Sequence, residues 1–364
     1  MQKAKMGINN QSLITRFSIK YLAESLRKNP EKLTHESLES HTSNSIPSPM
    51  GCGTWAWGNR LLWGYDESMD SQLQAVFNLC VERGVTLFDT GDSYGTGKLN
   101  GQSEKLLGRF TGEYTGYNAD HIRIATKLAP YPWRLTRHAM VKACQASATR
   151  LGRPVDLVQM HWSTGNYAPW QEGGLLDGLG DCLEKGLVKG VGLSNFGPKR
   201  LKSAYQKFAS RGIPITSLQV QYSLLSTYPL ADLGLKELCE QLGIKIIAYS
   251  PLALGLLTGK YRDNKNLPPG LRRFLFGQLI PAISPLMSCL EVIAQAKNKT
   301  ISQVALNWCI CKGTIPIPGA KNVRQAEDNL GALGWSLDSG EITELDKIAA
   351  GLDKKMVQNI FQTK

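Results

Sequence analysis

The stretch LFDTGDSYGTGKLNGQSE, residues 87–104, joins an apolar run to an Asp, a Tyr and four glycines. A strand followed by glycines and then a helix is how phosphate-binding loops begin. The dinucleotide fingerprint is G-x-G-x-x-G, whereas the glycines from position 95 are spaced G-x-G-x-x-x-G, and the triphosphate loop needs Ser or Thr after its Lys, where this chain has Leu. The glycines therefore identify neither site, and the candidates in this stretch are Asp89 and Tyr94.

Seven more short apolar runs occur along the chain, and amphipathic stretches separate several of them. Strands are expected at 50–55, 85–89, 122–127, 155–161, 190–194, 217–222, 244–250 and 314–319. Helices are expected at 70–84, 137–151, 198–211, 232–242 and 286–311, the last interrupted near 298–300. Continuously apolar strands are typical of a parallel sheet covered by helices on both faces. Eight such units without a linker predict an α/β fold, a closed (β/α)8 TIM barrel; the doubly wound alternative lacks its phosphate fingerprint.

Composition excludes several classes of protein. The chain has 364 residues, of which 42% are hydrophobic and 20% charged, as in a soluble globular protein. No apolar run approaches the roughly 18 residues that a membrane span needs, and no signal-peptide pattern opens the chain. We therefore expect neither membrane insertion nor secretion.

The net charge of +12 raises the question of nucleic-acid binding. Lys and Arg are spread along the chain and no basic tract is interleaved with aromatic residues, so no nucleic-acid partner is expected. An excess of Lys and Arg over Asp and Glu is also compatible with a pocket that binds a phosphorylated small cofactor. The eight cysteines show no C-x-x-C spacing, which predicts no metal site and reduced thiols in a reducing, cytoplasmic compartment.

Residues 1–48 differ from residues 49–364 in being rich in Ser, Asn, Lys and Glu. We expect an N-terminal extension, loosely attached or forming one amphipathic helix, before a single barrel domain. The helix is indicated by helical spacing of Leu13, Phe17, Tyr21 and Leu26. A transit peptide, which would place the protein in the plastid stroma, is the alternative; four glutamates count against it because transit peptides contain few acidic residues.

Polar side chains stand where three successive strands end, and the ends of barrel strands carry active sites. The second strand ends in Asp89 with Tyr94 five residues later, the third in Lys127 and the fourth in His161. Singly, the Asp could cap a helix, the Lys could be solvated and the His could be a core residue. Their occurrence together favours a shared catalytic site.

The four side chains have complementary chemistry. The Lys127 ammonium is expected to lower the pKa of Tyr94 by favouring phenolate, and Asp89 to hold Lys127 in place. Neutral His161 can orient a substrate oxygen. The set contains an acid and no evident nucleophile, which suits proton delivery to a carbonyl that receives a hydride. The long connection over residues 252–285 is expected to cover a ligand.

Six motifs, in order, resemble those of the aldo-keto reductase superfamily: FDTGDSYG, IATK, VQMHW, GVGLSN, AYSPL and IPIPGAKNVRQAEDN. The resemblance covers roughly residues 49–364. Segments such as GTWAWGN, LNGQSE, PYPWRLT and MVQNIFQTK further resemble the pyridoxal reductases of plastids and their cyanobacterial-type relatives.

The resemblance implies a catalytic tetrad of Asp89, Tyr94, Lys127 and His161, with Tyr94 as general acid. It also implies NADPH bound in extended form across the barrel mouth. The implied cofactor contacts are Gly53, Thr54, Trp55, Ser194, Asn195, Gln219, Tyr249, Ser250, Pro251, Leu252, Gly255, Gly319, Lys321, Gln325 and Asn329. Lys321 would face the 2′-phosphate and Tyr249 would stack on the nicotinamide. An aromatic substrate pocket is expected from Trp55, Trp133 and Trp162, which could alternatively pack beneath loops.

The implied activity is reduction of an aldehyde or ketone by NADPH, with pyridoxal converted to pyridoxine. Two alternatives stay open: a reductase of other reactive aldehydes, and an NADPH-binding regulatory subunit of the same fold. The expected partner is a small-molecule aldehyde, and the oligomeric state is left open.

Overall fold

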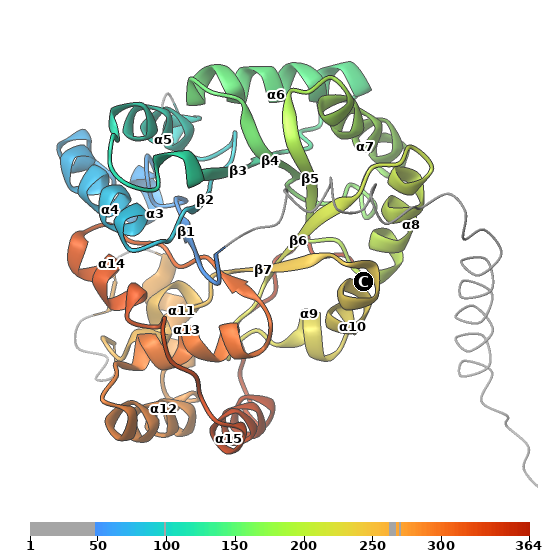
Figure 1. The fold of residues 1–364 in the computed structure, drawn as a ribbon. Coiled ribbons are helices and arrows are strands. Elements are labelled where there is room, and N and C mark those ends of the chain that lie inside the picture. Colours follow the sequence, from blue (N-terminus) through green and yellow to red (C-terminus); the bar gives the residue numbers. More distant parts are fainter. Residues whose placement is uncertain (1–47, 98–99, 262–266, 269–270) are drawn as a thin grey trace, which may run out of the picture. The chain divides into compact units, whose positions relative to one another are not determined.

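The computed structural model describes residues 48–97, 100–261, 267–268 and 271–364. Eight parallel strands pair in chain order, and helices surround them (Figure 1). A bridge between Gly53 and Gly319 links the first strand to the segment after the last. The predicted (β/α)8 barrel is confirmed. The helix expected within residues 1–48 lies outside the described residues, so the division at residue 48 stays a prediction.

All eight strands lie where the apolar runs predict them. The strands are β1 (Gly51–Gly53), β2 (Leu87–Asp89), β3 (Arg123–Leu128), β4 (Val155–Met160), β5 (Val188–Ser194), β6 (Ile215–Gln221), β7 (Lys245–Tyr249) and β8 (Ile315–Pro316). The last is short because Pro316 and Pro318 have no N–H to donate to a ladder.

The α-helices are α3 (Arg60–Trp63), α4 (Asp70–Glu82), α5 (Gln102–Glu113), α6 (Arg137–Leu151), α7 (Pro169–Glu184), α8 (Pro198–Ala209), α9 (Tyr228–Ala231), α10 (Leu235–Leu242), α11 (Leu271–Leu279), α12 (Ser284–Lys297), α13 (Ile301–Cys311), α14 (Val323–Leu330) and α15 (Ser339–Ala350). Short 3₁₀ helices are η3 (Glu67–Met69), η5 (Ala119–His121) and η6 (Ala253–Thr258).

Local chemistry explains two helix boundaries. The break predicted near 298–300 separates α12 from α13: Asn298 has a left-handed φ of 51° and Thr300 forms a capping box with Gln303. The helix expected at 232–242 instead begins at Leu235, because Gly234 precedes it in the left-handed conformation.

Side-chain alternation along the strands builds two layers inside the barrel. Leu87, Ala125, Leu157, Ile247, Ile315 and Ile317 form a small apolar cluster separate from the main core. Because side chains alternate with period two, Asp89, Lys127 and Gln159 share the face of Leu87, Ala125 and Leu157 and lie two residues nearer the carboxyl ends. The polar layer of Asp89, Lys127 and Gln159 therefore lies next to the apolar cluster, on its carboxyl-terminal side.

Closure of the barrel depends on the absence of a side chain at Gly53. A Cβ there would lie 2.7 Å from the backbone oxygen of Ile317. We expect Gly53→Ala to lower the free energy of unfolding by about 1–3 kcal/mol, the usual cost of overpacking. Urea denaturation measures it. The matched control is Gly112→Ala on α5, where a Cβ meets nothing within 4 Å; it is expected to stabilise the helix by about 0.5–1 kcal/mol. Equal effects of both changes would contradict the closure argument.

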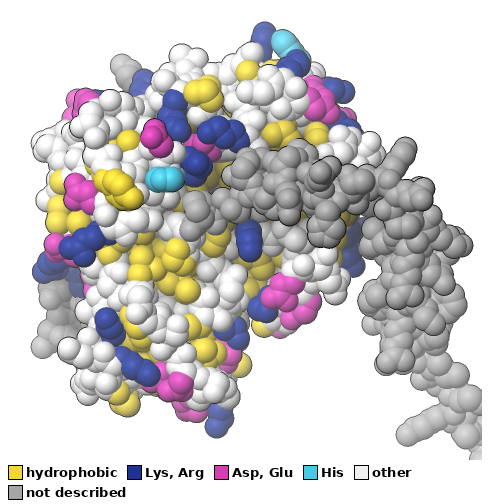
Figure 2. Space-filling model, in the orientation of Figure 1, with side chains coloured by type: hydrophobic (Ala, Val, Ile, Leu, Met, Phe, Trp, Pro, Cys, Tyr) yellow, Lys and Arg dark blue, Asp and Glu magenta, His cyan; other side chains and the backbone are white. Residues whose placement is uncertain are grey.

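Two surface properties bear on the sequence predictions. No single helix in the described part of the chain is long and apolar enough to cross a membrane, although α11 from Arg272 onward and α12 pass the same test as a bent pair. Figure 2 shows Lys and Arg side chains at many separate places on the face it draws, interspersed with Asp and Glu. The expected absence of a nucleic-acid partner stays a prediction.

Candidate active site

A buried ion pair lies in the polar layer of the barrel. Lys127 of β3 donates to Asp89 at the end of β2, and the two residues are only 1% and 2% exposed. The second Asp89 oxygen accepts from the Gln219 amide at 2.7 Å and the Gln159 amide at 3.3 Å. The carboxylate is therefore held by three donors, which compensates part of the cost of burying it.

Tyr94 and His161 lie next to this pair. The Lys127 Nζ is 4.9 Å from the centroid of the Tyr94 ring. The Tyr94 and His161 rings meet edge to face, with centroids 5.8 Å apart, and the Ser93 hydroxyl lies 3.4 Å from His161 Nδ1. The structure thus brings together the four side chains that stand apart in the sequence.

The electrostatics of Tyr94 differ from the sequence expectation. Burial raises the pKa of Tyr94 well above its ordinary value, and the negative charges of Asp89 and Asp92 raise it further. The expected lowering of this pKa is wrong, because burial and the two carboxylates disfavour phenolate more strongly than the Lys127 ammonium favours it. Tyr94 is therefore a protonated phenol at neutral pH, a state that can donate a proton.

Burial also determines the charge of His161. Desolvation lowers the pKa of His161 well below its usual value, and the Lys127 ammonium lowers it further. The imidazole is therefore neutral at pH 7. Burial likewise lowers the pKa of Lys127, while the Asp89 carboxylate acts in the opposite direction.

The ends of β5, β6 and β7 form a polar network centred on Asn195. Its amide donates to the His161 carbonyl and the Ser194 hydroxyl, both at 3.1 Å, and accepts from the Tyr249 hydroxyl at 2.9 Å. Ser194, Asn195 and Gln219 are almost fully buried. Burial raises the pKa of Tyr249, so its hydroxyl stays a donor.

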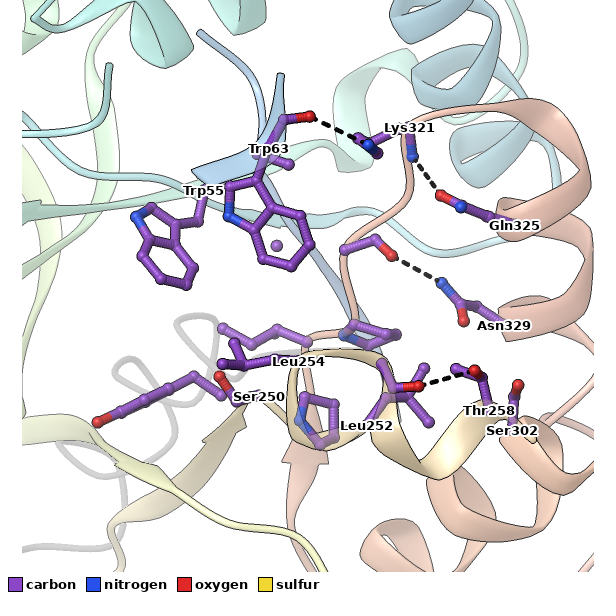
Figure 3. Close-up of a pocket in the computed structure, with 18 of the residues that line it drawn as sticks. Trp55, Trp63, Ser250, Leu252, Leu254, Thr258, Ser302, Lys321, Gln325 and Asn329 are labelled. Carbon is purple, nitrogen blue, oxygen red and sulfur yellow. Dashed lines mark hydrogen bonds between the residues drawn. The ribbon is translucent and has the colours of Figure 1, made fainter. Parts of the chain in front are cut away.

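A cavity of about 490 Å³ opens beside Asp89 and Tyr94. Most of the expected cofactor contacts line it: Gly53, Trp55, Tyr249, Ser250, Pro251, Leu252, Gly255, Gly319, Lys321, Gln325 and Asn329. Figure 3 shows the Trp55 and Trp63 rings across the cavity from Leu252 and Leu254. The cavity therefore reaches from Asp89 and Tyr94 to the start of α14.

Lys321 lies in the cavity lining, between β8 and α14. Its Nζ donates to the Trp63 carbonyl at 3.1 Å, and its backbone N–H donates to the Gln325 side chain at 2.9 Å (Figure 3). Asn329 donates to the Gly319 carbonyl at 3.3 Å. Burial lowers the pKa of Lys321, as do the positive charges of Arg272 and Lys260. Three cations of the cavity lining thus lie near one another.

The sequence reasoning missed several of these residues. Gln159 lies between Leu157 and His161 at period-two spacing, a signal that could have placed it in the barrel. Trp63 and Arg272 line the cavity, and the guanidinium lies 4.4 Å from the indole centroid. The unusual length of the connection over residues 252–285 is the feature of the sequence that could have indicated a ligand contact by Arg272.

Other predicted residues lie outside the cavity lining. Lys127, Ser194, Asn195 and Gln219 are buried beside the cavity, and the half-buried His161 contacts this network.

Thr54 is fully buried, and its hydroxyl donates to the Asp89 carbonyl at 2.9 Å. Trp133 is 74% exposed and stacks on Tyr131 at 4.6 Å. Trp162 stacks on Phe361 at 4.3 Å. Of the three tryptophans expected around a substrate, only Trp55 lines the cavity.

Comparison with known proteins identifies relatives over most of the chain. The family model described as the aldo/keto reductase family matches residues 49–350. The chloroplastic pyridoxal reductase of Arabidopsis thaliana is 55% identical over 320 residues, which cover 87% of each chain. A probable pyridoxal reductase of Schizosaccharomyces pombe is 27% identical over 85% of this chain and 92% of its own.

Solved structures agree in fold. A thermostable aldo-keto reductase in complex with the inhibitor epalrestat has a TM-score of 0.66 at 26% identity, covering 83% of this chain and 95% of its own. An aldo-keto reductase of Klebsiella pneumoniae in complex with NADPH has a TM-score of 0.65 at 24% identity. The match covers 86% of this chain and 94% of the Klebsiella chain. The barrel, the matched residues and the 55% identical relative together show that this chain belongs to the aldo/keto reductase family.

Proposed function

We propose that this chain reduces pyridoxal and related aldehydes to alcohols with NADPH, and that Tyr94 is the general acid. The observation that carries the proposal is the Tyr94 phenol beside a buried Lys–Asp pair, on a cavity whose lining also holds three cations. The name of the Arabidopsis relative supports pyridoxal as the substrate.

The cavity fits a long, phosphorylated cofactor. Lys321, Arg272 and Lys260 supply positive charge at one end, and the Trp63 Nε1 and Arg272 Nε atoms are buried with no hydrogen-bond partner among the described residues. Unsatisfied buried donors favour an acceptor-rich ligand. When bound, NADPH supplies the hydride.

The protein's own residues supply orientation and a proton. Neutral His161 can donate a hydrogen bond to the substrate oxygen and hold it near the Tyr94 hydroxyl. Tyr94 then donates its proton to the oxygen as negative charge develops there. The nearby Lys127 ammonium, held by Asp89, stabilises the phenolate that Tyr94 briefly becomes.

A steady-state assay tests the proposal. Purified full-length protein should consume NADPH when pyridoxal is added and form pyridoxine, and kcat/KM is compared among pyridoxal, methylglyoxal and an aromatic aldehyde. A higher kcat/KM for methylglyoxal would favour the reactive-aldehyde alternative. Tight NADPH binding without turnover of any aldehyde would favour a regulatory subunit and refute the proposed activity.

Lys321 is proposed to select NADPH over NADH. Lys321→Met should weaken NADPH binding by roughly ten- to a hundredfold, because charge-assisted hydrogen bonds contribute about 1.5–3 kcal/mol, and should change NADH binding little. Fluorescence titration with both cofactors measures this difference. The control is Lys236→Met, which removes a lysine paired with Glu240 on α10. Equal weakening of NADPH and NADH would show that Lys321 does not contact the 2′-phosphate.

The compartment of this chain is proposed from its relative. The Arabidopsis protein is named chloroplastic, which supports the plastid stroma over the cytoplasm. Residues 1–48 fused to a fluorescent protein should accumulate in plastids of plant cells. A diffuse cytosolic signal would contradict the proposal and support the cytoplasmic prediction.

A further inference from the structure

The segment of residues 356–363 is tied to loops at the mouth of the barrel. The Met356 N–H donates to the Leu225 carbonyl at 2.9 Å, and the Gln221 amide donates to the Val357 carbonyl at 3.1 Å. Gln358 donates to the Ser226 hydroxyl at 2.6 Å. These contacts attach the first part of the segment to the end of β6 and the residues that follow it.

Thr363 attaches the far part of the segment to the end of β5. It is only 2% exposed. Its backbone N–H donates to the Asn195 carbonyl at 3.1 Å, and its hydroxyl accepts from the Gly197 N–H at 2.7 Å. A Cβ at Gly197 would lie 2.2 Å from the Thr363 carbonyl oxygen, so only glycine permits this approach. Such close docking holds the backbone on both sides of Phe196.

Asn195 depends on these contacts because its backbone conformation is less favourable than an extended or right-handed one. Its φ is 60°, in the left-handed region that residues with a side chain seldom adopt, although asparagine tolerates it best among them. Such a conformation persists only when its surroundings hold it. The Asn195 side chain contacts the Tyr249 hydroxyl and the His161 carbonyl, so a change in its backbone would displace both.

A second contact joins the same segment to this network. The Asn359 side chain lies close enough to Tyr249 to oppose the rise in the pKa of that phenol caused by burial. Phe361 stacks on Trp162, whose ring lies 4.9 Å from that of His161. The segment therefore contacts the network at Asn195, at Tyr249 and beside His161.

We propose that Thr363 is a positioning residue that holds Asn195 in its left-handed conformation, and so fixes Tyr249 and the end of β4 at the nicotinamide end of the cavity. This inference rests on the proposed function, because it takes Asn195 and Tyr249 as cofactor contacts. It assigns the segment of residues 356–363 a role in cofactor affinity, separate from proton donation by Tyr94.

Three variants of the full-length chain test the proposal. Thr363→Val removes the acceptor of the Gly197 N–H, Thr363→Ser retains it, and Thr343→Val removes a hydroxyl that bonds within α15 at 2.7 Å. Thr363→Val should raise the Kd for NADPH by about five- to tenfold, the loss expected when one buried donor is left unsatisfied. Thr363→Ser should restore wild-type affinity, and Thr343→Val should not change it.

The accompanying measurements separate positioning from general stability. At saturating NADPH, the loss of kcat in Thr363→Val should be smaller than the rise in its Kd for NADPH, since the lost interaction acts first on cofactor binding. Hydrogen exchange at residues 195–197, measured without cofactor, should accelerate in Thr363→Val. Unchanged affinity and exchange in Thr363→Val, or equal weakening in Thr363→Ser, would overturn the inference. Wild-type protein that fails to bind NADPH would instead refute the proposed function, and the exchange comparison would still test the link from Thr363 to Asn195.

Discussion

Tyr94→Phe is expected to lower kcat for aldehyde reduction by about 10²–10⁴-fold, the contribution typical of a positioned general acid. The change removes only the hydroxyl. Burial and the charges of Asp89 and Asp92 keep that hydroxyl protonated at neutral pH, so proton donation is the function that the variant loses. The ring remains beside Lys127 and His161, and we therefore expect the Kd for NADPH to change little. Stopped-flow measurement of NADPH consumption and a fluorescence titration give the two values.

The control for this variant is Tyr117→Phe, which removes the hydroxyl of a tyrosine that is 89% exposed. It should leave both kcat and cofactor affinity unchanged. A Tyr94→Phe protein that retained the wild-type kcat would show that another group delivers the proton. A large loss of NADPH affinity in Tyr94→Phe would indicate that the phenol binds cofactor as well.

Asp89→Ala is expected to lower the free energy of unfolding by about 3–5 kcal/mol, the cost of leaving one partner of a buried ion pair uncompensated. The Lys127 ammonium would stay in the barrel without its carboxylate. The Gln219 and Gln159 amides would each lose an acceptor. The pKa of Lys127 should fall further, because Asp89 is the group that raises it most strongly. Urea denaturation measures the stability change.

A solvent-exposed ion pair gives the comparison. Lys236→Met breaks the pair with Glu240 on α10, where the side chains are 35% and 61% exposed. Such helix pairs contribute about 0.2–0.5 kcal/mol. Replacing both buried partners, as in Asp89→Leu with Lys127→Met, should recover part of the stability lost in Asp89→Ala but none of the activity. A loss below about 1 kcal/mol in Asp89→Ala would show that water reaches Lys127 and solvates it.

Much of the architecture follows from local patterns in the sequence. Each of the eight strands is an apolar run bounded by turn residues, and the break between α12 and α13 is marked by Asn298 and Thr300. The order of the strands in the sheet could be predicted without knowledge of long-range contacts, because successive βα units usually place their strands side by side. The polar residues at the strand ends then identified Asp89, Lys127 and His161 as neighbours.

Side-chain pKa values, exposure and contacts depend on burial and could not be predicted from local sequence patterns. The direction of the Tyr94 pKa shift depends on how much water reaches the ring and on Asp92, which the sequence reasoning did not consider. Trp133 follows a strand end, yet it is exposed and stacks on Tyr131. Gln159 lies in a strand that reads as apolar and still points its amide at Asp89.

The fold class and the residues at the carboxyl ends of the strands could be predicted from the amino-acid sequence, because period and spacing are properties of neighbouring residues. Three properties depend on the tertiary structure: the raised pKa of Tyr94, the proximity of Arg272 to Lys321 in the cavity lining, and the contact of Thr363 with Asn195 across 168 positions of the chain. Desolvation and charge depend on everything packed within a few ångströms of a group, and most of those atoms belong to residues distant in the sequence.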